Sequence, residues 1–378
     1  MSMLSITRRS ALLGAIATMA CARNAAYSQA AAQSLQELAS AKGVDYGAMV
    51  TWKSWDGDDA INRDDAFSQL VERECGLIVS AMEMFWRLNS KNAGAMDFSG
   101  ADALIDWAAK QGKKVRGHNL IWHEQTPDWF KTIGDKAYAE KMLVQHVSAM
   151  CGRYAGRMHS WDVANEVLSP GSDRPDGLRQ SAFLDQLGPG FLDLAFQTAR
   201  AADPKALLVV NDYNLEYDID HNEKKRRQML NLIDGFKQRG TPIDAVGIQS
   251  HLWMERRPHF SQDVFAGFLK EVSDRGLQIM VTELDVVDVG APADVAARDA
   301  AVAAMYKDYL DVALANPATR TVVTWGLCDP DSWISHYNLD EFRRPDGLPP
   351  RPLPFDGDLK PKPAYFAIAG AFGAAPAR

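Results

Sequence analysis

The chain has few cysteines for its length. Its 378 residues include four, Cys21, Cys75, Cys151 and Cys328, and none belongs to a CxxC pair, which argues against a cysteine-based zinc site. Cys21 lies in the first 30 residues. The other three are an odd number, which excludes a complete disulfide framework but leaves one bridge open. We expect these three thiols to be free and buried.

Excess positive charge is also missing. The formal net charge is -8 at pH 7, although the first 30 residues contain three arginines and no acidic residue. The rest of the chain is therefore more acidic still. A protein that binds a nucleic-acid backbone needs a clustered basic face, so we expect no nucleic-acid partner.

Beyond residue 30, no stretch is apolar enough to cross a bilayer, and we expect no integral membrane segment.

Residues 1–30 place Arg8 and Arg9 before an apolar run of small residues that ends near AYSQA. This is the layout of a secretory signal, and the paired arginines resemble the twin-arginine type. A helix or anchor is the less favoured alternative, and Cys21 fits a lipid attachment site poorly. We expect an exported protein, periplasmic or secreted, with one domain at 31–378.

Eight short apolar or β-branched runs alternate with helix-like stretches. The runs are residues 44–51, 75–82, 114–122, 159–167, 206–214, 243–251, 278–286 and 320–328. Helix-like stretches, with apolar residues at three- and four-residue intervals, include 101–112, 140–156, 223–240 and 297–315. Gly112 and Gly240 fall where the glycine after a helix belongs. Apolar strands that alternate with helices indicate a covered parallel sheet, and eight units predict a single closed (β/α)8 barrel, the TIM barrel of the α/β class.

Polar residues gather at the C-terminal ends of these runs, where a TIM barrel carries its catalytic groups. Glu166 lies near the end of the fourth run and Glu283 late in the seventh. Strand alternation puts Glu283 and Asp285 on one face, with Thr282 and Leu284 on the other. We therefore expect Glu166 and Glu283 to point into the same mouth.

Two carboxyl groups across a cleft suit the cleavage of a glycosidic bond. One protonates the departing oxygen while the other meets the sugar carbon that becomes positively charged. A separation of roughly 5–5.5 Å lets the second attack directly with retention of configuration, whereas a wider gap admits a water molecule and inverts it. The acid needs a raised pKa, for which Trp161, Trp325 and Trp333 are candidate wall residues. The alternative is that Glu166 and Glu283 only stabilise the fold as ion-pair members.

Six motifs resemble those of one enzyme family. In chain order they are GHNLIWH, WDVANE, NDYN, GIQSHL, VTELDV and WGLCDPDSW. Together they are similar to glycoside hydrolase family 10, the (β/α)8 xylanases, from about residue 40 to the C-terminus. The resemblance implies a retaining endo-β-1,4-xylanase-like glycosidase with a β-linked polysaccharide or oligosaccharide as substrate and no cofactor. Endo or exo action and the oligomeric state stay open.

The resemblance also implies roles for individual residues. Glu166 matches the general acid/base and Glu283 the nucleophile. Asn165 matches the residue that hydrogen-bonds the 2-hydroxyl of the sugar being cleaved. His251 and Asp285 match the pair behind the nucleophile, where a carboxylate-supported imidazole can hold a carboxylate ionised. The positions that shape the glycone-side pocket are matched by His118, Trp122, Gln249, Trp325 and Trp333.

A metal site is the alternative for two of the histidines. His118 and His123 are five residues apart, which puts them on opposite faces of a strand end. With no third ligand evident, we expect no catalytic metal, while a structural calcium stays open.

One stretch departs from the family pattern. After the second strand the family carries TPENxMKW, whose Glu, Asn and Lys hold the xylose two units back from the cleaved bond, whereas residues 80–86 are SAMEMFW. Ala81, Met82 and Phe85 stand in the three polar positions, while Trp86 still matches. Each lost polar contact costs roughly 1–3 kcal/mol. We therefore expect an atypical distal glycone subsite.

Several alternatives remain open from the sequence. One alternative is that Met82, Met84 and Phe85 pack as core residues while neighbours such as Arg87 or Lys91 reach into the site. Another is that Glu83 serves as the glutamate in a slipped alignment. An alternative substrate is a non-xylan glycan, such as an exopolysaccharide or a plant glycoside. A non-catalytic carbohydrate-binding protein is a further alternative, against which the presence of both glutamates argues. The Pro- and Gly-rich stretch after the last run offers three candidates for the missing polar contacts: Tyr337, Arg343 and Arg344.

Overall fold

The computed structural model describes residues 33–52, 61, 65–336 and 339–378. Residues 1–30 and Tyr337 lie outside the described residues, so the export signal stays a prediction. Within the described ranges, no helix has the length and apolar character needed to cross a membrane.

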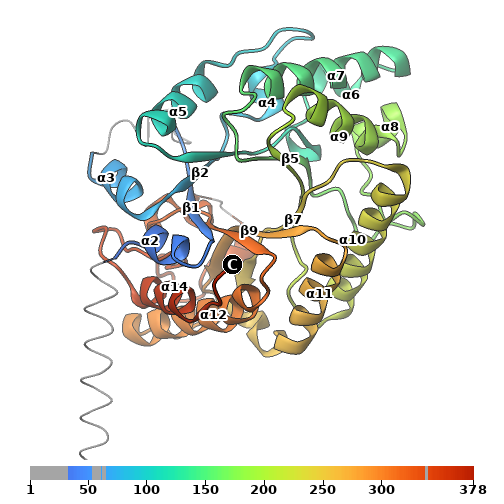
Figure 1. The fold of residues 1–378 in the computed structure, drawn as a ribbon. Helices are drawn as coiled ribbons and strands as arrows, with labels where there is room; N and C mark the ends of the chain where they lie inside the picture. The colour runs from blue at the N-terminus through green and yellow to red at the C-terminus, as the bar shows by residue number, and fades with distance from the viewer. Residues whose placement is uncertain (1–32, 53–60, 62–64, 337–338) are drawn as a thin grey trace, which may run out of the picture.

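Eight parallel strands of the described chain close into a barrel (Figure 1). They follow one another around the barrel in chain order, and the last, β10, pairs with both β9 and β1. Their bounds are β1 Asp45–Val50, β2 Leu77–Ser80, β3 Lys114–Gly117, β5 Ser160–Asn165, β6 Leu207–Asp212, β7 Ala245–Ile248, β9 Gln278–Val287 and β10 Thr319–Thr324. Each strand overlaps one predicted run, so the predicted (β/α)8 barrel is confirmed.

Two predicted runs are interrupted near the mouth of the barrel. The run 114–122 forms β3 and then the short β4 (Ile121–Trp122), which pairs with β5. The run 243–251 forms β7, after which β8 (His251–Trp253) pairs with β9. The predicted site residues His118 and Gln249 lie in these two breaks, outside the regular pleat.

The barrel strands are buried because helices cover their outer faces and side chains fill the interior. All four residues of β7 are buried. In the interior, Val209, Ala245 and Met280 pack against one another. On the outside, alternate residues such as Val210 and Val246 belong to the large core between strands and helices.

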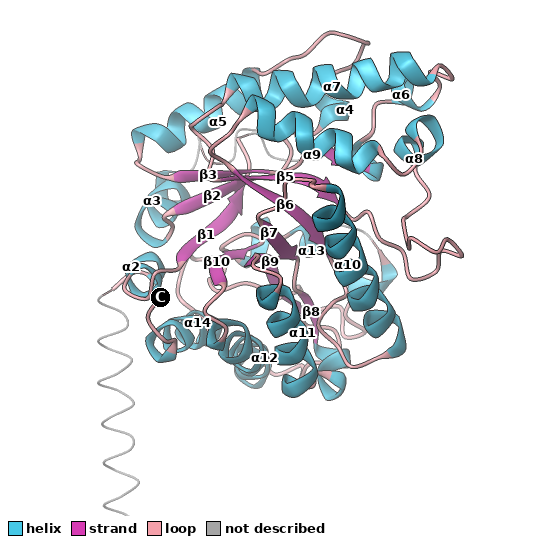
Figure 2. Ribbon diagram, turned by 45° about the vertical axis from the view of Figure 1, so that its right-hand side comes forward, coloured by secondary structure: helices cyan, strands magenta, loops and turns pink. Residues whose placement is uncertain are grey.

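The helices lie outside the strands (Figure 2). Their bounds are α2 Leu35–Ser40, α3 Asp65–Glu74, α4 Trp86–Asn89, α5 Ser99–Lys110, α6 Asp128–Lys131, α7 Lys136–Arg153, α8 Ala182–Leu187, α9 Phe191–Ala202, α10 Asp220–Arg239, α11 Gln262–Asp274, α12 Val295–Ala315, α13 Trp333–His336 and α14 Pro363–Ala374. The first and last described helices, α2 and α14, pack side by side and close the ring (Figure 1).

The predicted helices 101–112, 140–156, 223–240 and 297–315 correspond to α5, α7, α10 and α12. Helix α10 ends at Gly240, which has the left-handed conformation at φ 72°, as expected for a glycine that follows a helix. Helix α7 begins earlier than predicted, because the Asp135 side chain accepts a hydrogen bond from the Tyr138 amide and caps the helix.

Cys75, Cys151 and Cys328 are free and buried, as predicted. Burial raises the pKa of each thiol, so all three stay protonated. All three pack in the large apolar core, and the Cys328 thiol also donates a hydrogen bond to Asp331 Oδ2 at 2.7 Å.

Candidate active site

The C-terminal ends of the strands open into a cleft of about 590 Å³. The predicted site residues that line it are His118, Trp122, Asn165, Glu166, Gln249, His251, Glu283, Trp325 and Trp333. The tenth, Asp285, is buried and hydrogen-bonded to His251. The barrel thus brings these ten residues together.

Glu166 follows directly after β5, in the left-handed region of backbone conformation at φ 56°. This conformation is strained for a residue with a side chain and is found at functional sites. The carboxyl group accepts hydrogen bonds from Trp122 Nε1 at 2.9 Å and from Gln249 Nε2 at 3.1 Å. Burial, followed by the negative charges of Asp212 and Glu283, raises the pKa of Glu166. A carboxyl group with a raised pKa is suited to donate a proton near neutral pH.

Glu283 lies in β9, and its surroundings have the opposite effect. Its buried carboxylate accepts hydrogen bonds from Asn211 Nδ2 at 2.7 Å and from His251 Nε2 at 3.2 Å. Burial alone would raise the pKa of Glu283, but the hydrogen bond from His251 and nearby positive charges outweigh it and lower the pKa. The group is therefore held as a carboxylate, the form that can attack an electron-poor carbon.

His251 is placed between two carboxylates. Its Nδ1 lies 2.9 Å from Asp285 Oδ1, and its Nε2 faces Glu283. Burial alone would lower the pKa of His251, but the two carboxylates raise it to about 10. The imidazole is therefore positively charged and donates a hydrogen bond from each nitrogen. Trp333 Nε1 donates to the second oxygen of Asp285 at 2.6 Å.

A chain of amide side chains joins the two glutamates. Asn211 Nδ2 donates to Glu283 and also to Asn165 Oδ1, at 2.8 Å. Gln249 Nε2 donates to the same Asn165 oxygen at 3.3 Å and to Glu166. Asn165 therefore accepts hydrogen bonds from the partners of both carboxyl groups. Asn211 was not among the predicted site residues, although it opens the NDYN motif.

The predicted alternation along β9 does not hold around Glu283. Thr282 was expected on the opposite face, yet its Oγ1 donates to Asn211 Oδ1 at 2.7 Å, and Asn211 also contacts Glu283. The pairing of β9 with β10 shifts register between Val281 and Leu284. This irregularity breaks the two-residue period, so neighbouring side chains approach the same amide.

A buried charged cluster lies beside the cleft. His118 Nδ1 is 2.7 Å from Asp162 Oδ2, and Arg116 forms an ion pair with the other oxygen of Asp162. Arg116 and Asp162 are fully buried. Neither was predicted, although Asp162 is the polar residue inside the WDVANE motif. The cluster fixes the His118 ring through Nδ1, and His118 lines the cleft.

Trp161 does not form part of the cleft wall, so that prediction is wrong. Its indole is fully buried, and Nε1 donates to Asp203 Oδ2 at 3.1 Å. Trp161 and Asp162 are neighbours on β5 and point to opposite sides of the sheet. The tryptophan beside Glu166 is instead Trp122, while Trp325 and Trp333 line the cleft as expected.

An apolar surface faces the cleft where the polar glycone contacts were expected. Ala81 and Phe85 line it, and Met82 packs against the small apolar cluster that contains Ala81. Glu83 cannot replace the missing glutamate, because its buried carboxylate accepts hydrogen bonds from the Trp52 amide at 2.6 Å and from Ser80 Oγ at 2.8 Å.

The two arginines suggested as replacements do not line the cleft. Arg344 is buried, where its guanidinium pairs with Asp346 and donates to the carbonyl of Ala291. Arg343 is exposed and pairs with Asp340.

The structure also places in the cleft several residues that were not predicted: Met49, Glu124, Gln125, Arg179, Tyr213, Asn214, Trp253, Arg256 and Glu341. Tyr213 and Asn214 complete the quoted NDYN motif, which was the available signal. Within the described chain, no cluster of three His, Cys, Asp or Glu side chains is arranged to hold a metal ion.

The chain is similar to known enzymes of one family. The model of the family described as glycosyl hydrolase family 10 matches residues 34–371. Endo-1,4-beta-xylanase 3 of Hypocrea jecorina is 31% identical over 342 residues, which cover 90% of this chain and 86% of that protein.

Two solved structures show the same architecture. Native xylanase 10C from Cellvibrio japonicus is 28% identical with a TM-score of 0.80, over 91% of this chain and 73% of that one. Xylanase 10B from Thermotoga petrophila, solved in complex with xylobiose, is 27% identical with a TM-score of 0.77, over 90% of this chain and 97% of that one. These matches agree with the family that the six motifs resemble.

Proposed function

Because the chain belongs to glycoside hydrolase family 10 and is a glycosidase of the endo-xylanase type, we propose that it cleaves β-1,4-linked xylose chains with Glu283 as nucleophile and Glu166 as general acid/base. The observation that carries the assignment is the pair of opposite pKa shifts in one cleft. The pKa of Glu166 is raised and the pKa of Glu283 is lowered. Two carboxyl groups with separated pKa values can take the acid and the nucleophile roles at one pH.

The reaction proceeds in two displacements. In the first, Glu166 gives its proton to the glycosidic oxygen while Glu283 attacks the anomeric carbon, which forms a covalent glycosyl-enzyme and releases the leaving fragment. In the second, Glu166, now ionised, takes a proton from water, which displaces Glu283. Each displacement inverts the configuration at the anomeric carbon, so the two together retain it. Asn165, fixed by its hydrogen bonds from Asn211 and Gln249, keeps its Nδ2 for the substrate 2-hydroxyl.

The charge on His251 sets the acidic limit of activity in this proposal. In Asp285→Asn, His251 loses a negative neighbour, so the pKa of His251 falls and a larger share of the imidazole is neutral near pH 7. Glu283 then loses a positive neighbour, and its pKa rises. The acidic limb of kcat/KM against pH is expected to move to higher pH, because this limb reports the nucleophile in the free enzyme.

The measurement is a kcat/KM profile on an aryl β-xyloside for the wild type, Asp285→Asn and Trp333→Phe. The last variant removes only a neutral donor to Asp285, so its acidic limb should move less. An acidic limb that stays in place in Asp285→Asn contradicts the role given to His251.

We further propose that the distal glycone subsite is weakened for plain xylan. Ala81, Met82 and Phe85 offer no hydrogen-bond group for a second xylose, and Glu83 is engaged elsewhere. Adding a second xylose on the glycone side, from an aryl β-xyloside to an aryl β-xylobioside, is therefore expected to raise kcat/KM by less than about tenfold, or about 1.4 kcal/mol.

The same pair of substrates, with unsubstituted xylan and other β-linked glycans alongside, tests this proposal. A thousandfold gain from the second xylose, or ordinary affinity for unsubstituted xylan, would contradict it. Faster cleavage of a less polar β-linked glycan would support the alternative that the substrate is an exopolysaccharide or a plant glycoside.

A further inference from the structure

One short segment of the chain contacts both glutamates of the cleft. It consists of Gln249, Ser250 and His251, from the end of β7 to the start of β8. Gln249 Nε2 donates to Glu166 at 3.1 Å, and His251 Nε2 donates to Glu283 at 3.2 Å. The carbonyl of Gln249 also accepts the Glu283 amide at 2.9 Å. The backbone of this segment therefore sets where two donors meet the two carboxyl groups.

Ser250, the middle residue of the segment, has a strained backbone. It is fully buried and lies in the left-handed region at φ 66°, which a residue with a side chain keeps only where its surroundings enforce it. The Gln249 amide donates to the Asp212 carbonyl of β6 at 3.0 Å, as in a strand ladder. The Ser250 amide instead donates to a side chain, Oε1 of Glu216, at 3.2 Å. The strained conformation therefore depends on a carboxylate from another loop.

Glu216 joins the loop after β6 to the segment after β7. It is buried and does not line the cleft. Its Oε2 accepts the Leu215 amide at 2.8 Å, while Oε1 accepts the Ser250 amide. Arg226 of α10 fixes this loop on both sides of Glu216, because its Nη1 donates to the carbonyls of Leu215 and Tyr217 at 3.1 and 2.6 Å. Both oxygens of Glu216 therefore hold backbone amides from a rigid position.

A second contact from the same loop lies on the other side of His251. The Tyr217 hydroxyl accepts the Trp253 amide at 2.6 Å. Glu216 and Tyr217 thus hold the backbone both before His251, at Ser250, and after it, at Trp253. The imidazole that donates to the nucleophile is placed between these two points.

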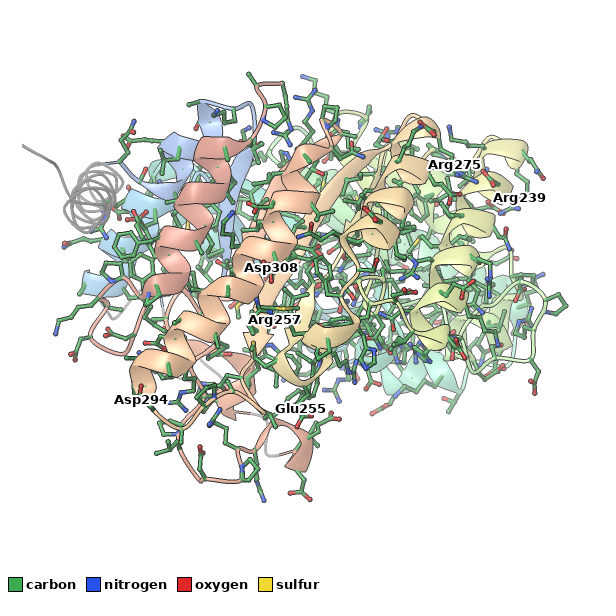
Figure 3. The ribbon with its side chains drawn as sticks, turned by 90° about the horizontal axis from the view of Figure 1, so that it is seen from below. Arg239, Glu255, Arg257, Arg275, Asp294 and Asp308 are labelled. Carbon is green, nitrogen blue, oxygen red and sulfur yellow. The ribbon has the colours of Figure 1, made fainter. Side chains whose placement is uncertain are left out.

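Tyr309 holds Ser250 from a third element, α12. The Ser250 hydroxyl donates to the Ile248 carbonyl at 3.0 Å and is hydrogen-bonded to the fully buried Tyr309 hydroxyl. Because the serine proton is used on Ile248, the tyrosine is the donor. Helix α12 also contacts the 3-10 helix Met254–His259 after β8: Figure 3 shows Arg257 beside Asp308 of α12, and the two side chains pair at 2.7 Å.

We propose that Glu216 is a positioning residue of the active site, which holds Ser250 in its left-handed conformation. Through this backbone it keeps the donors Gln249 and His251 in contact with the two glutamates. An active site needs such support, because a displacement of about 1 Å can cost about a hundredfold in rate. The inference rests on the proposed function, since it names the residue that supports the acid and the nucleophile assigned there.

Glu216→Gln tests the proposal directly. The variant keeps the size of the side chain but only one acceptor oxygen, so one of the two amides meets an NH2 group. Gln249 and His251 should then move off the glutamates, and kcat on an aryl β-xyloside should fall by about tenfold or more. Burial raises the pKa of Glu166 and of Glu283, and the hydrogen bonds from Gln249 and His251 act against it. Both limbs of kcat/KM against pH should therefore move to higher pH.

A loss of charge and a loss of position have opposite signatures. Burial raises the pKa of Glu216, against its backbone hydrogen bonds and the positive charges of His251 and Lys225. Removing the negative charge of Glu216, acting through space alone, would lower the pKa of both cleft glutamates and move both limbs to lower pH. Tyr309→Phe removes a neutral donor to Ser250, so it should move both limbs to higher pH, by less than Glu216→Gln. It carries the same test if Glu216→Gln does not fold.

Glu74 provides a matched control. It is buried, precedes β2 at the opposite end of the barrel, and its Oε2 accepts the Leu35 amide at 2.9 Å. Glu74→Gln removes the same kind of contact far from the cleft. It should lower stability, change kcat by less than about twofold and leave both limbs in place.

A double-variant cycle tests whether Glu216 acts through the conformation of Ser250. Ser250→Gly removes the strain, because a residue without Cβ adopts a positive φ freely. The loss of kcat caused by Glu216→Gln should therefore be smaller in the Ser250→Gly background than in the wild type. Equal losses in the two backgrounds overturn the inference.

The other failures are also distinguishable. If the wild type does not cleave the aryl β-xyloside, the proposed function is wrong. If Glu216→Gln behaves like Glu74→Gln, less stable but with kcat and both limbs in place, Glu216 only supports the fold, and the inference is overturned while the proposed function stands. Limbs that move to lower pH in Glu216→Gln, or that stay in place in Tyr309→Phe, overturn it as well.

Discussion

Replacing Glu283 with glutamine is expected to lower kcat on an aryl β-xyloside by about 10⁴-fold or more, the scale of losing an essential nucleophile. Glutamine keeps the size of the side chain and an acceptor for the Asn211 amide, so the fold should survive. It cannot form the covalent glycosyl-enzyme at a useful rate. Glu341→Gln, which removes an exposed carboxylate from the same cleft, should change kcat less than about twofold.

Azide separates the roles of the two glutamates. In Glu283→Ala, azide can enter the space of the lost carboxylate and attack once, which gives a glycosyl azide of inverted configuration. In Glu166→Ala, azide attacks the glycosyl-enzyme formed by Glu283 and gives an azide of retained configuration. The measurement is the anomeric configuration by NMR. The opposite pairing would exchange the roles, and full activity of Glu283→Ala would exclude Glu283 as the nucleophile. A protein that only binds the glycan would show no turnover in the wild type and unchanged binding in Glu283→Ala.

Replacing Lys225 with methionine is expected to reduce the free energy of unfolding by about 3–5 kcal/mol. Lys225, on α10, and Asp212, at the end of β6, are both fully buried, and Lys225 Nζ lies 2.5 Å from Asp212 Oδ1. The ammonium group also lies 3.6 Å from the centre of the Tyr213 ring. Removing the lysine leaves a buried carboxylate without its cation, which is the costly half of such a pair.

Two further variants isolate this effect in chemical denaturation. Lys224→Met removes an exposed charge on α10 together with its hydrogen bond to the Pro170 carbonyl, and should reduce stability by about 0.5–1.5 kcal/mol, much less than Lys225→Met. The double variant Asp212→Asn with Lys225→Met removes both charges and should recover part of the loss. An unfolding free energy of Lys225→Met within 1 kcal/mol of wild type would contradict the importance of the pair; about 1 kcal/mol is the average effect of any substitution.

The fold was predictable because its signals are local and repeated. A strand buried on both faces needs a continuous apolar run, and the covering helices need apolar residues every three or four positions. The ends of the helices were predicted less accurately, because they depend on single capping residues such as Asp135 at the start of α7. No local pattern in the sequence indicated the breaks between β3 and β4 and between β7 and β8.

The site was predictable where motifs placed polar residues at strand ends, and less so where contacts join distant strands. Asn211 contacts Glu283 and Asn165 from a third strand. Thr282 reaches the same amide only because β9 shifts register. Arg257 pairs with Asp308 of α12, whereas no carboxylate among the described residues lies within ion-pair distance of its neighbour Arg256, a difference that no spacing encodes.

By itself, the order of residues determined the eight-unit barrel, the family resemblance and the two glutamates, because periodicity and motif spacing are properties of the chain. The tertiary structure alone decided which carboxyl group has the raised pKa and can stay protonated, and which is ionised. That difference comes from burial and from charges on other strands: Asp212 beside Glu166, and His251 beside Glu283. Distances through space govern such energies, and the linear sequence does not contain them.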